Sequence, residues 1–295
     1  MDMKEITVIS GKGGTGKTSL AACFAALSQN SIITDCDVDA ANLSLIMRPL
    51  LKETNDFSAS CEAFILKEKC TRCGLCRELC RFGAISPDFI VDSFACEGCA
   101  VCYNACPDGA VLYEEVVSGQ WFISQTPYGP LIHARLGIAQ ENSGKLVTLI
   151  RNKAVEISRM EDREYIITDG PPGIGCPVIS ALAGVSAALV VTEPTLSGIS
   201  DLERVLEVCR HFEVETLVCI NRCDLDEENS SKIEEYCRVQ GIPLVGKVPL
   251  DRKVTEAMVE GVPVVEFSDS EISRCIKNLW ERVNEYLNQG YLTQM

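Results

Sequence analysis

The sequence GKGGTGKT occupies residues 11–18 and directly follows a short apolar run at residues 6–9. It matches the pattern G-x-x-x-x-G-K-[ST], in which the backbone N–H groups of a glycine-rich loop bind phosphate oxygens. The apolar run predicts a strand, and a helix is expected to begin near Lys17. A glycine-rich turn could arise by chance, but a strand before it and a helix after it favour a nucleotide-binding loop.

The residue types of this loop have separate tasks. Lys17 carries the charge that pairs with phosphate, and the hydroxyl of Thr18 is a ligand for Mg²⁺. The glycines let backbone N–H groups turn toward the β-phosphate. The predicted nucleotide-binding residues of the loop are Gly11, Lys12, Gly13, Gly14, Thr15, Gly16, Lys17, Thr18 and Ser19.

Further apolar runs extend this unit into a larger domain. Buried strands are expected at residues 32–34, 165–168, 188–191 and 216–220, and a helix with one apolar stripe is expected at residues 146–157. Strands that alternate with helices indicate a parallel sheet covered on both faces. The predicted fold class is α/β, a doubly wound parallel sheet of the P-loop NTPase type with a small inserted module.

Two cysteine runs interrupt the alternation. Each has the spacing C-x₂-C-x₂-C-x₃-C, which binds [4Fe–4S] clusters in two-cluster ferredoxins, where the fourth cysteine of each run ligates the other cluster. The predicted ligands are Cys70, Cys73, Cys76 and Cys106 for the first cluster and Cys96, Cys99, Cys102 and Cys80 for the second. Eight thiolates could also bind two zinc ions, although zinc modules usually place their C-x₂-C pairs farther apart.

The cysteine runs define the expected domain organisation. Residues 1–57 form the first part of a P-loop ATPase domain, residues 58–115 an inserted ferredoxin module with two clusters, and residues 116–295 the second part of the ATPase domain. Arg81 follows Cys80 where ferredoxins usually have proline. This cation either raises the potential of the second cluster by stabilising its reduced state or faces solvent without effect.

The composition limits the possible partners and location. The 295 residues include 42 acidic and 27 basic side chains, a net charge of −15, which disfavours nonspecific binding to nucleic acid or anionic lipid. No signal-peptide pattern and no apolar stretch of about 18 residues is seen. The apolar stripe at residues 272–287 lacks a basic face, which predicts a helix packed on the sheet. We expect a cytoplasmic protein without nucleic-acid or membrane partners, whose cysteines are metal ligands or buried hydrophobes.

The second lysine of the loop, Lys12, makes the sequence resemble the deviant Walker A ATPases, the class of MinD, ParA and the nitrogenase iron protein. In that class this lysine reaches the nucleotide of the partner subunit. The resemblance therefore implies that Lys12 acts in trans within a homodimer that forms on ATP binding, and that Lys17 of the same loop takes part in catalysis.

The sequence DCDVDAANL at residues 35–43 resembles the second-strand motif of the same class. The resemblance implies that Asp37 orients the attacking water, with Asp35 and Asp39 as nearby alternatives. A carboxylate at the carboxyl end of a parallel strand lies beside the phosphate loop, where such sheets bind their ligands.

Two later segments also resemble the class. The sequence DGPPG at residues 169–173 is similar to its switch II segment, which implies that Asp169 assists Mg²⁺ through water. Asn221 and Arg222, and Pro249 farther along, resemble the residues that contact adenine. These residues complete the predicted nucleotide site.

Taken together, the chain resembles MinD-superfamily ATPases with an inserted ferredoxin domain. This implies that ATP hydrolysis with Mg²⁺ drives rearrangement of a homodimer and gates electron flow through two [4Fe–4S] clusters to an unidentified redox partner protein. The alternative is an ATP-dependent regulatory or assembly module whose clusters are structural, redox-sensing or cargo. Four cysteines per cluster favour electron transfer, because fully ligated clusters are hard to give away.

Overall fold

The computed structural model describes residues 3–137 and 143–289. The chain divides into two compact units, one of Met1–Thr54, Trp121–Arg135 and Ser143–Met295, the other of Asn55–Gln120 and Leu136–Asn142. The predicted insert at residues 58–115 lies inside the second unit. Residues 55–57, 116–120 and 136–137, which the sequence analysis placed in the ATPase domain, belong to the second unit as well.

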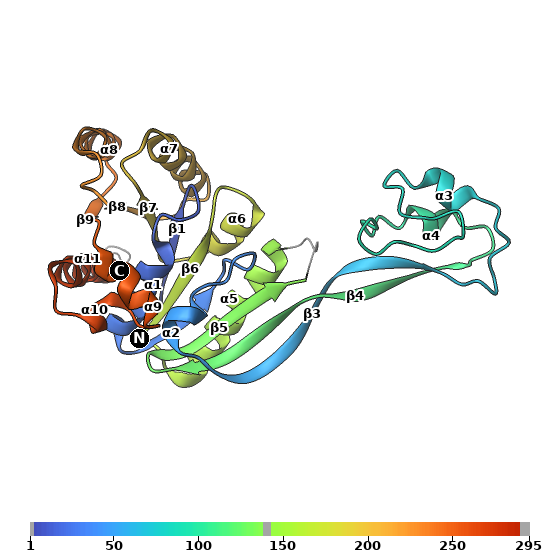
Figure 1. Cartoon of the computed structure of the whole chain (residues 1–295), viewed down its shortest axis with the longest axis horizontal. Helices are drawn as coiled ribbons and strands as arrows, with labels where there is room; N and C mark the ends of the chain where they lie inside the picture. The colour runs from blue at the N-terminus through green and yellow to red at the C-terminus, as the bar shows by residue number, and fades with distance from the viewer. Residues whose placement is uncertain (1–2, 138–142, 290–295) are drawn as a thin grey trace. The chain divides into compact units, whose positions relative to one another are not determined.

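The first unit is built on a sheet with the strand order β3-β4-β5-β2-β6-β1-β7-β8-β9 (Figure 1). Its strands are β1 (Lys4–Ser10), β2 (Ser31–Asp35), β5 (Gly129–Leu136), β6 (Tyr165–Pro172), β7 (Ala187–Thr192), β8 (Thr216–Asn221) and β9 (Leu244–Val248), with β3 (Leu50–Ile65) and β4 (Val111–Thr126) extending into the second unit. Strand β1 pairs in parallel with β6 and β7, and β2, β8 and β9 continue the parallel register.

The sheet is mainly but not wholly parallel, which corrects the sequence-based prediction. Only two residues separate β4 from β5, a connection too short for anything but an antiparallel pair. The sequence analysis also missed β3, β4, β5 and β9. Strand β3 is largely exposed and polar, so it carries no apolar run that would mark it as a buried strand.

Helices cover both faces of the sheet. The helices of the first unit are α1 (Lys17–Ser28), α2 (Ser44–Met47), α5 (Ser143–Glu161), α6 (Cys176–Leu182), α7 (Leu196–His211), α8 (Glu227–Gln240), α9 (Arg252–Val259), α10 (Val264–Phe267) and α11 (Glu271–Gln289). Along β7, Leu189 and Val191 pack with α1 and α11, whereas Ala188 and Val190 pack with α6, α7 and α8. This period of two confirms the doubly covered sheet.

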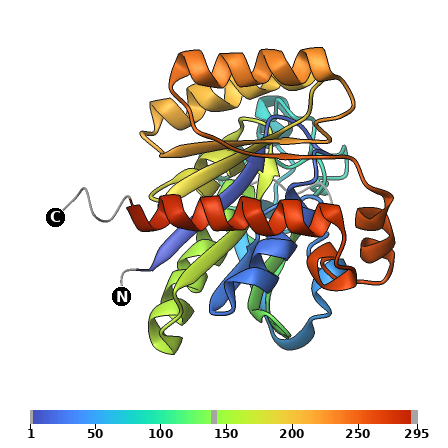
Figure 2. The same cartoon turned by 90° about the vertical axis from the view of Figure 1, so that its left-hand side faces the viewer.

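Helix α11 packs as the sequence predicted. The apolar side chains that face the sheet are Ile272, Ile276, Leu279, Val283 and Leu287, and all are buried. Figure 2 shows α11, in red, lying along the sheet. Within the described ranges, no helix combines the length and the apolar character that crossing a membrane would require.

The second unit contains two short helices, α3 (Leu75–Leu79) and α4 (Val101–Ala105), one in each cysteine run. The two runs repeat the same backbone conformation. Gly74 and Ala100 occupy equivalent positions directly before the two helices and have φ angles of 88° and 59°. Arg72 and Gly98 occupy equivalent positions two residues earlier and have φ angles of 57° and 58°. The sequence repeat is therefore also a structural repeat.

Candidate functional site

A cleft of about 770 Å³ opens at the carboxyl ends of the parallel strands. The phosphate loop, the segment after β2, the end of β6 and the segments after β8 and β9 form its walls. The predicted site residues that line it are Gly13, Gly14, Gly16, Lys17, Thr18, Ser19, Asp37, Asn221, Arg222 and Pro249. The structure thus brings together, from distant parts of the chain, most of the residues that the sequence predicted for nucleotide binding.

The phosphate loop is shaped by glycines and held by β8. Gly14 and Gly16 have φ angles of 81° and 92°, a left-handed conformation that L side chains rarely adopt. A Cβ atom on Gly16 would lie only 2.3 Å from Nδ2 of Asn221. That amide donates a hydrogen bond of 2.7 Å to the carbonyl oxygen of Thr15. Asn221, the last residue of β8, therefore supports the phosphate loop.

The aspartates at and after the end of β2 divide into a structural one, Asp35, and two that line the cleft, Asp37 and Asp39. Asp35 is fully buried, and its two carboxylate oxygens accept hydrogen bonds from the backbone N–H groups of Asp37 (3.2 Å) and Leu43 (3.1 Å). Asp35 thereby fixes the turn that carries Asp37. Asp37 is half-buried and lines the cleft, as does Asp39, whereas Asp35 does not.

Asp169 lies opposite Asp35 in the register of β2 and β6. It is buried, and within the described part of the chain neither of its carboxylate oxygens has a hydrogen-bond partner. Burying an unpartnered carboxylate is costly unless a cation compensates it. Oxygen ligands are those that Mg²⁺ prefers, so Asp169, with the hydroxyl of Thr18 beside it, fits a magnesium site.

The charges of the site perturb one another. Burial lowers the pKa of the Lys17 ammonium, while Asp169 and Asp37 act in the opposite direction. Burial raises the pKa of the half-buried Asp37, and Lys17 opposes that shift. Several carboxylates and one buried lysine thus share a small volume, which suits a ligand that brings both phosphate and a divalent cation.

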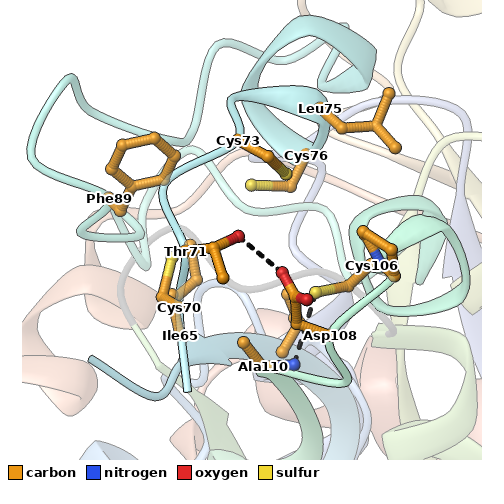
Figure 3. A pocket seen from close by; sticks show the side chains of 12 residues that line it. Ile65, Cys70, Thr71, Cys73, Leu75, Cys76, Phe89, Cys106, Asp108 and Ala110 are labelled. Atoms are coloured by element: carbon orange, nitrogen blue, oxygen red, sulfur yellow. Dashed lines mark hydrogen bonds between the residues drawn. The ribbon is translucent and has the colours of Figure 1, made fainter. Parts of the chain in front are cut away.

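In the second unit, the cysteines surround two separate cavities. The first cavity is lined by Cys70, Cys73, Cys76 and Cys106 (Figure 3), and the second by Cys80, Cys96, Cys99 and Cys102. Each cavity thus receives three cysteines from one run and the fourth from the other. Cys106 Sγ accepts a hydrogen bond of 3.3 Å from the backbone N–H of Ala110, the kind of contact that stabilises a thiolate ligand.

Four cysteines around each cavity are the donor set that a [4Fe–4S] cluster requires, so the residues present fit such a cluster. Within residues 3–137 and 143–289, no three His, Cys, Asp or Glu side chains lie close enough together to hold one metal ion. Arg72 and Ala100 adopt the left-handed backbone conformation, which is unfavourable for L residues.

Comparison with known proteins decides the family. The model for the CobQ/CobB/MinD/ParA nucleotide binding domain matches residues 6–264. The chain belongs to this family. MinD/ParA-family proteins are nucleotide-hydrolysing ATPases, so the chain is a MinD/ParA-like ATPase.

Similar proteins cover nearly the full length of this MinD/ParA-family chain. The uncharacterized protein MJ0578 of Methanocaldococcus jannaschii is 32% identical over 96% of this chain and 97% of its own length. The structure of the septum site-determining protein MinD of Pyrococcus horikoshii with Mg-ADP is similar in fold, with a TM-score of 0.62 and 18% identity over 98% of this chain and 99% of that one. An iron–sulfur cluster carrier protein of Pyrococcus horikoshii is 24% identical over 50% of this chain and 54% of its own length.

The family's second lysine, Lys12, does not line the cleft. Its Nζ atom donates hydrogen bonds to the hydroxyls of Thr195 (3.3 Å) and Ser197 (3.1 Å) and lies 3.5 Å from a carboxylate oxygen of Glu193. In the single chain, Lys12 is thus held at the start of α7, away from the nucleotide cleft of its own subunit.

The predicted base-contacting residues Asn221, Arg222 and Pro249 all line the cleft. Arg222 forms an ion pair with Glu193, and its backbone N–H donates to Oδ1 of Asn221 at 3.0 Å. Pro249 follows β9. Ser19 Oγ contacts Met258 Sδ at 3.5 Å.

The sequence analysis missed Glu193. Glu193 directly follows the buried strand β7, as Asp169 follows the predicted strand at residues 165–168 within β6. A charged residue at the carboxyl end of a buried strand was therefore the signal that could have indicated it. Burial of the other cysteines agrees with the prediction for most of them, since Cys23, Cys36, Cys209, Cys219 and Cys237 are buried.

Magnesium affinity is expected to depend on pH through Asp169. Burial raises the pKa of Asp169 to about 7, whereas an unfolded aspartate titrates at about 3.9. The folded protein therefore keeps a proton on this carboxyl group between about pH 4 and 7, and Mg²⁺ must displace it. We expect the Mg²⁺-dependent affinity for ADP to fall by up to about tenfold per pH unit below pH 7.

Isothermal titration in buffers of different ionisation enthalpy measures both the affinity and the released proton. Without Mg²⁺, the free energy of unfolding should decrease as pH rises from about 4 to 7, because in this range the folded state binds a proton on Asp169 that the unfolded state has released. Asp169→Asn should flatten the pH dependence of the magnesium affinity and reduce that of the free energy of unfolding, to which Asp35, whose pKa is also raised by burial, still contributes. A magnesium affinity that stays constant down to pH 5.5 would show that Asp169 does not carry this proton.

Proposed function

We propose that this MinD/ParA-family ATPase hydrolyses Mg·ATP as a homodimer and carries two [4Fe–4S] clusters that pass electrons to a redox partner protein in the cytoplasm. The observation that carries the proposal is the pair of cavities in the second unit. Each is lined by four cysteines with ferredoxin spacing, in the same chain as a complete nucleotide cleft.

The chain's residues divide the work of hydrolysis. The loop N–H groups and Lys17 bind the β- and γ-phosphates, and Thr18 and Asp169 hold Mg²⁺. Asp37 accepts a hydrogen bond from the attacking water and orients it. Lys12 leaves the start of α7 and stabilises the charge that develops on the γ-phosphate of the second copy.

The eight cysteines form two ligand sets, one with Cys73 at an exposed position and one with Cys99 at an exposed position. When bound, each cluster accepts and releases one electron. Clusters held by these cysteines would lie near solvent, where a partner protein can reach them. Arg81 stacks over Phe82, 4.9 Å from its ring centroid, and Phe82 lines the second cavity, which favours an effect of this cation on the second cluster.

A regulatory or assembly module remains the second candidate. It is favoured by the similarity to an iron–sulfur cluster carrier protein, which covers half of this chain. Under that function the clusters would be structural, redox-sensing or cargo, and ATP would control association with a partner.

Redox titration followed by EPR separates the two functions. Strands β3 and β4 begin in one unit and end in the other, so a nucleotide-driven movement of the sheet can change the hydrogen bonds or exposure of a cluster. We expect ATP, but not ADP, to shift one midpoint potential by roughly tens of millivolts, where about 59 mV is a tenfold change in equilibrium constant.

The Lys12→Ala variant is the control, because it should abolish the shift together with ATP-dependent dimerisation while leaving nucleotide binding through Lys17 intact. If both midpoint potentials are unchanged by ATP while ATP still controls binding to a partner, the regulatory module replaces electron transfer as the proposed function.

A further inference from the structure

Glu193 lies between two cations that come from different strands. Lys12 follows β1, Glu193 follows β7 and Arg222 follows β8, and these three strands are neighbours in the sheet. One carboxylate oxygen of Glu193 lies 3.5 Å from Lys12 Nζ, and the other pairs with the guanidinium of Arg222. The sheet order therefore places one carboxylate between the trans-acting lysine and a residue of the nucleotide cleft.

Burial makes this carboxylate depend on its cations. The side chain of Glu193 is 8% exposed, whereas those of Lys12 and Arg222 are 32% and 38% exposed. A buried carboxylate that loses all its cationic partners is strongly disfavoured. Lys12 can move into solvent at little cost of its own, so the energetic obstacle to its departure is the charge that it leaves behind on Glu193.

Arg222 is linked to the phosphate loop as well as to Glu193. Its backbone N–H donates to Asn221 Oδ1 at 3.0 Å, and Asn221 Nδ2 donates to the carbonyl of Thr15 at 2.7 Å. Arg222 also adopts a left-handed backbone conformation, with φ of 52°, which fixes the direction in which its side chain leaves the end of β8.

We propose that Glu193 is a shared counter-ion that couples the release of Lys12 to the positioning of Arg222. This rests on the proposed function, in which Lys12 leaves its own subunit for the nucleotide of a second copy. When Lys12 leaves, Arg222 remains as the cation of Glu193, so the buried carboxylate stays compensated. Because Glu193 then pairs with Arg222 alone, the guanidinium of Arg222 is held more firmly beside the cleft. Glu193 acts through these two side chains and is a positioning residue.

A double-mutant cycle on dimerisation tests the coupling. The variants are Glu193→Gln, Arg222→Met and the combination of both, and dimerisation is measured by sedimentation velocity with saturating AMPPNP, so that changes in nucleotide affinity do not enter. Glu193→Gln keeps hydrogen-bond acceptance but removes the charge that holds Lys12. We expect it to tighten the dimer by about tenfold, the factor that corresponds to about 1.4 kcal/mol.

Arg222→Met is expected to weaken the dimer by about tenfold when Glu193 is present, because Lys12 is then the only cation left for the carboxylate. In the Glu193→Gln background the same change should have little effect, and this lack of additivity is the signature of the coupling. Ser197→Ala is the matched control, since it removes a neutral contact of Lys12 and should change the dimer constant by less than about threefold.

Thermal unfolding of each variant without nucleotide checks that the fold is kept. Independent effects of Glu193→Gln and Arg222→Met would overturn the coupling, even if Lys12→Ala loses ATP-dependent dimerisation as the proposed function requires. A Lys12→Ala variant that dimerises normally would overturn the proposed function itself, and the coupling with it.

Discussion

Asp37→Ala is expected to slow ATP hydrolysis by roughly 10²–10⁴-fold, the usual contribution of a positioned group that activates water. Asp37 lines the cleft, and its turn is held by the buried carboxylate of Asp35. The substitution therefore removes the carboxylate that faces the nucleotide without removing the group that shapes the turn. ATP should still bind through Lys17 and the loop, and the dimer should accumulate because hydrolysis no longer opens it.

The measurement is a single-turnover hydrolysis assay combined with sedimentation velocity in the presence of ATP. Asp39→Ala is the matched control, because Asp39 also lines the cleft and carries the same charge. Its hydrolysis rate should stay within a few-fold of that of the unmodified protein. If Asp39→Ala abolishes hydrolysis and Asp37→Ala does not, the role of the water-orienting residue passes to Asp39.

Cys73→Ala is expected to remove one of two clusters. Protein purified without oxygen should contain about eight irons per chain, as two four-iron clusters require, and the variant should retain about four. Cys73 lines only the first cavity, which shares no cysteine with the second, so the loss should be confined to one EPR signal. Iron analysis and EPR of the reduced protein measure the two quantities.

Two further variants make the assignment specific. Cys99→Ala should remove the other signal, because Cys99 lines only the second cavity. Cys61→Ala should keep all the iron, since Cys61 belongs to the second unit but to neither ligand set. Two zinc ions per chain, or about four irons in the unmodified protein, would contradict the two-cluster assignment.

The sequence alone was enough to locate the parts whose chemistry lies within a short stretch of chain. The phosphate loop needs eight neighbouring residues, and the strand before it and α1 after it were found as predicted. Each cysteine run is similarly compact. Residues close in sequence are close in space whatever the remainder of the fold, so spacing by itself predicts such sites.

Strands without an apolar run escaped sequence analysis. Strands β3 and β4 mix buried, half-buried and exposed positions over 16 residues each without regular alternation, so the periodicity that marks a core strand does not appear in their sequences. Strands β4 and β5 place an antiparallel pair beside a parallel sheet, and β3 and β4 each cross the boundary between the two units.

Only the tertiary structure decided which distant side chains meet. Asp35 and Asp37 are two residues apart and chemically equal. Asp35 is buried and accepts hydrogen bonds from the backbone N–H groups of Asp37 and Leu43, whereas the side chain of Asp37 lines the cleft. The meeting of Lys12, Glu193 and Arg222 depends on β1, β7 and β8 being neighbours in the sheet. Strand order is set by the burial of both sheet faces as a whole, a property that no local stretch of sequence contains.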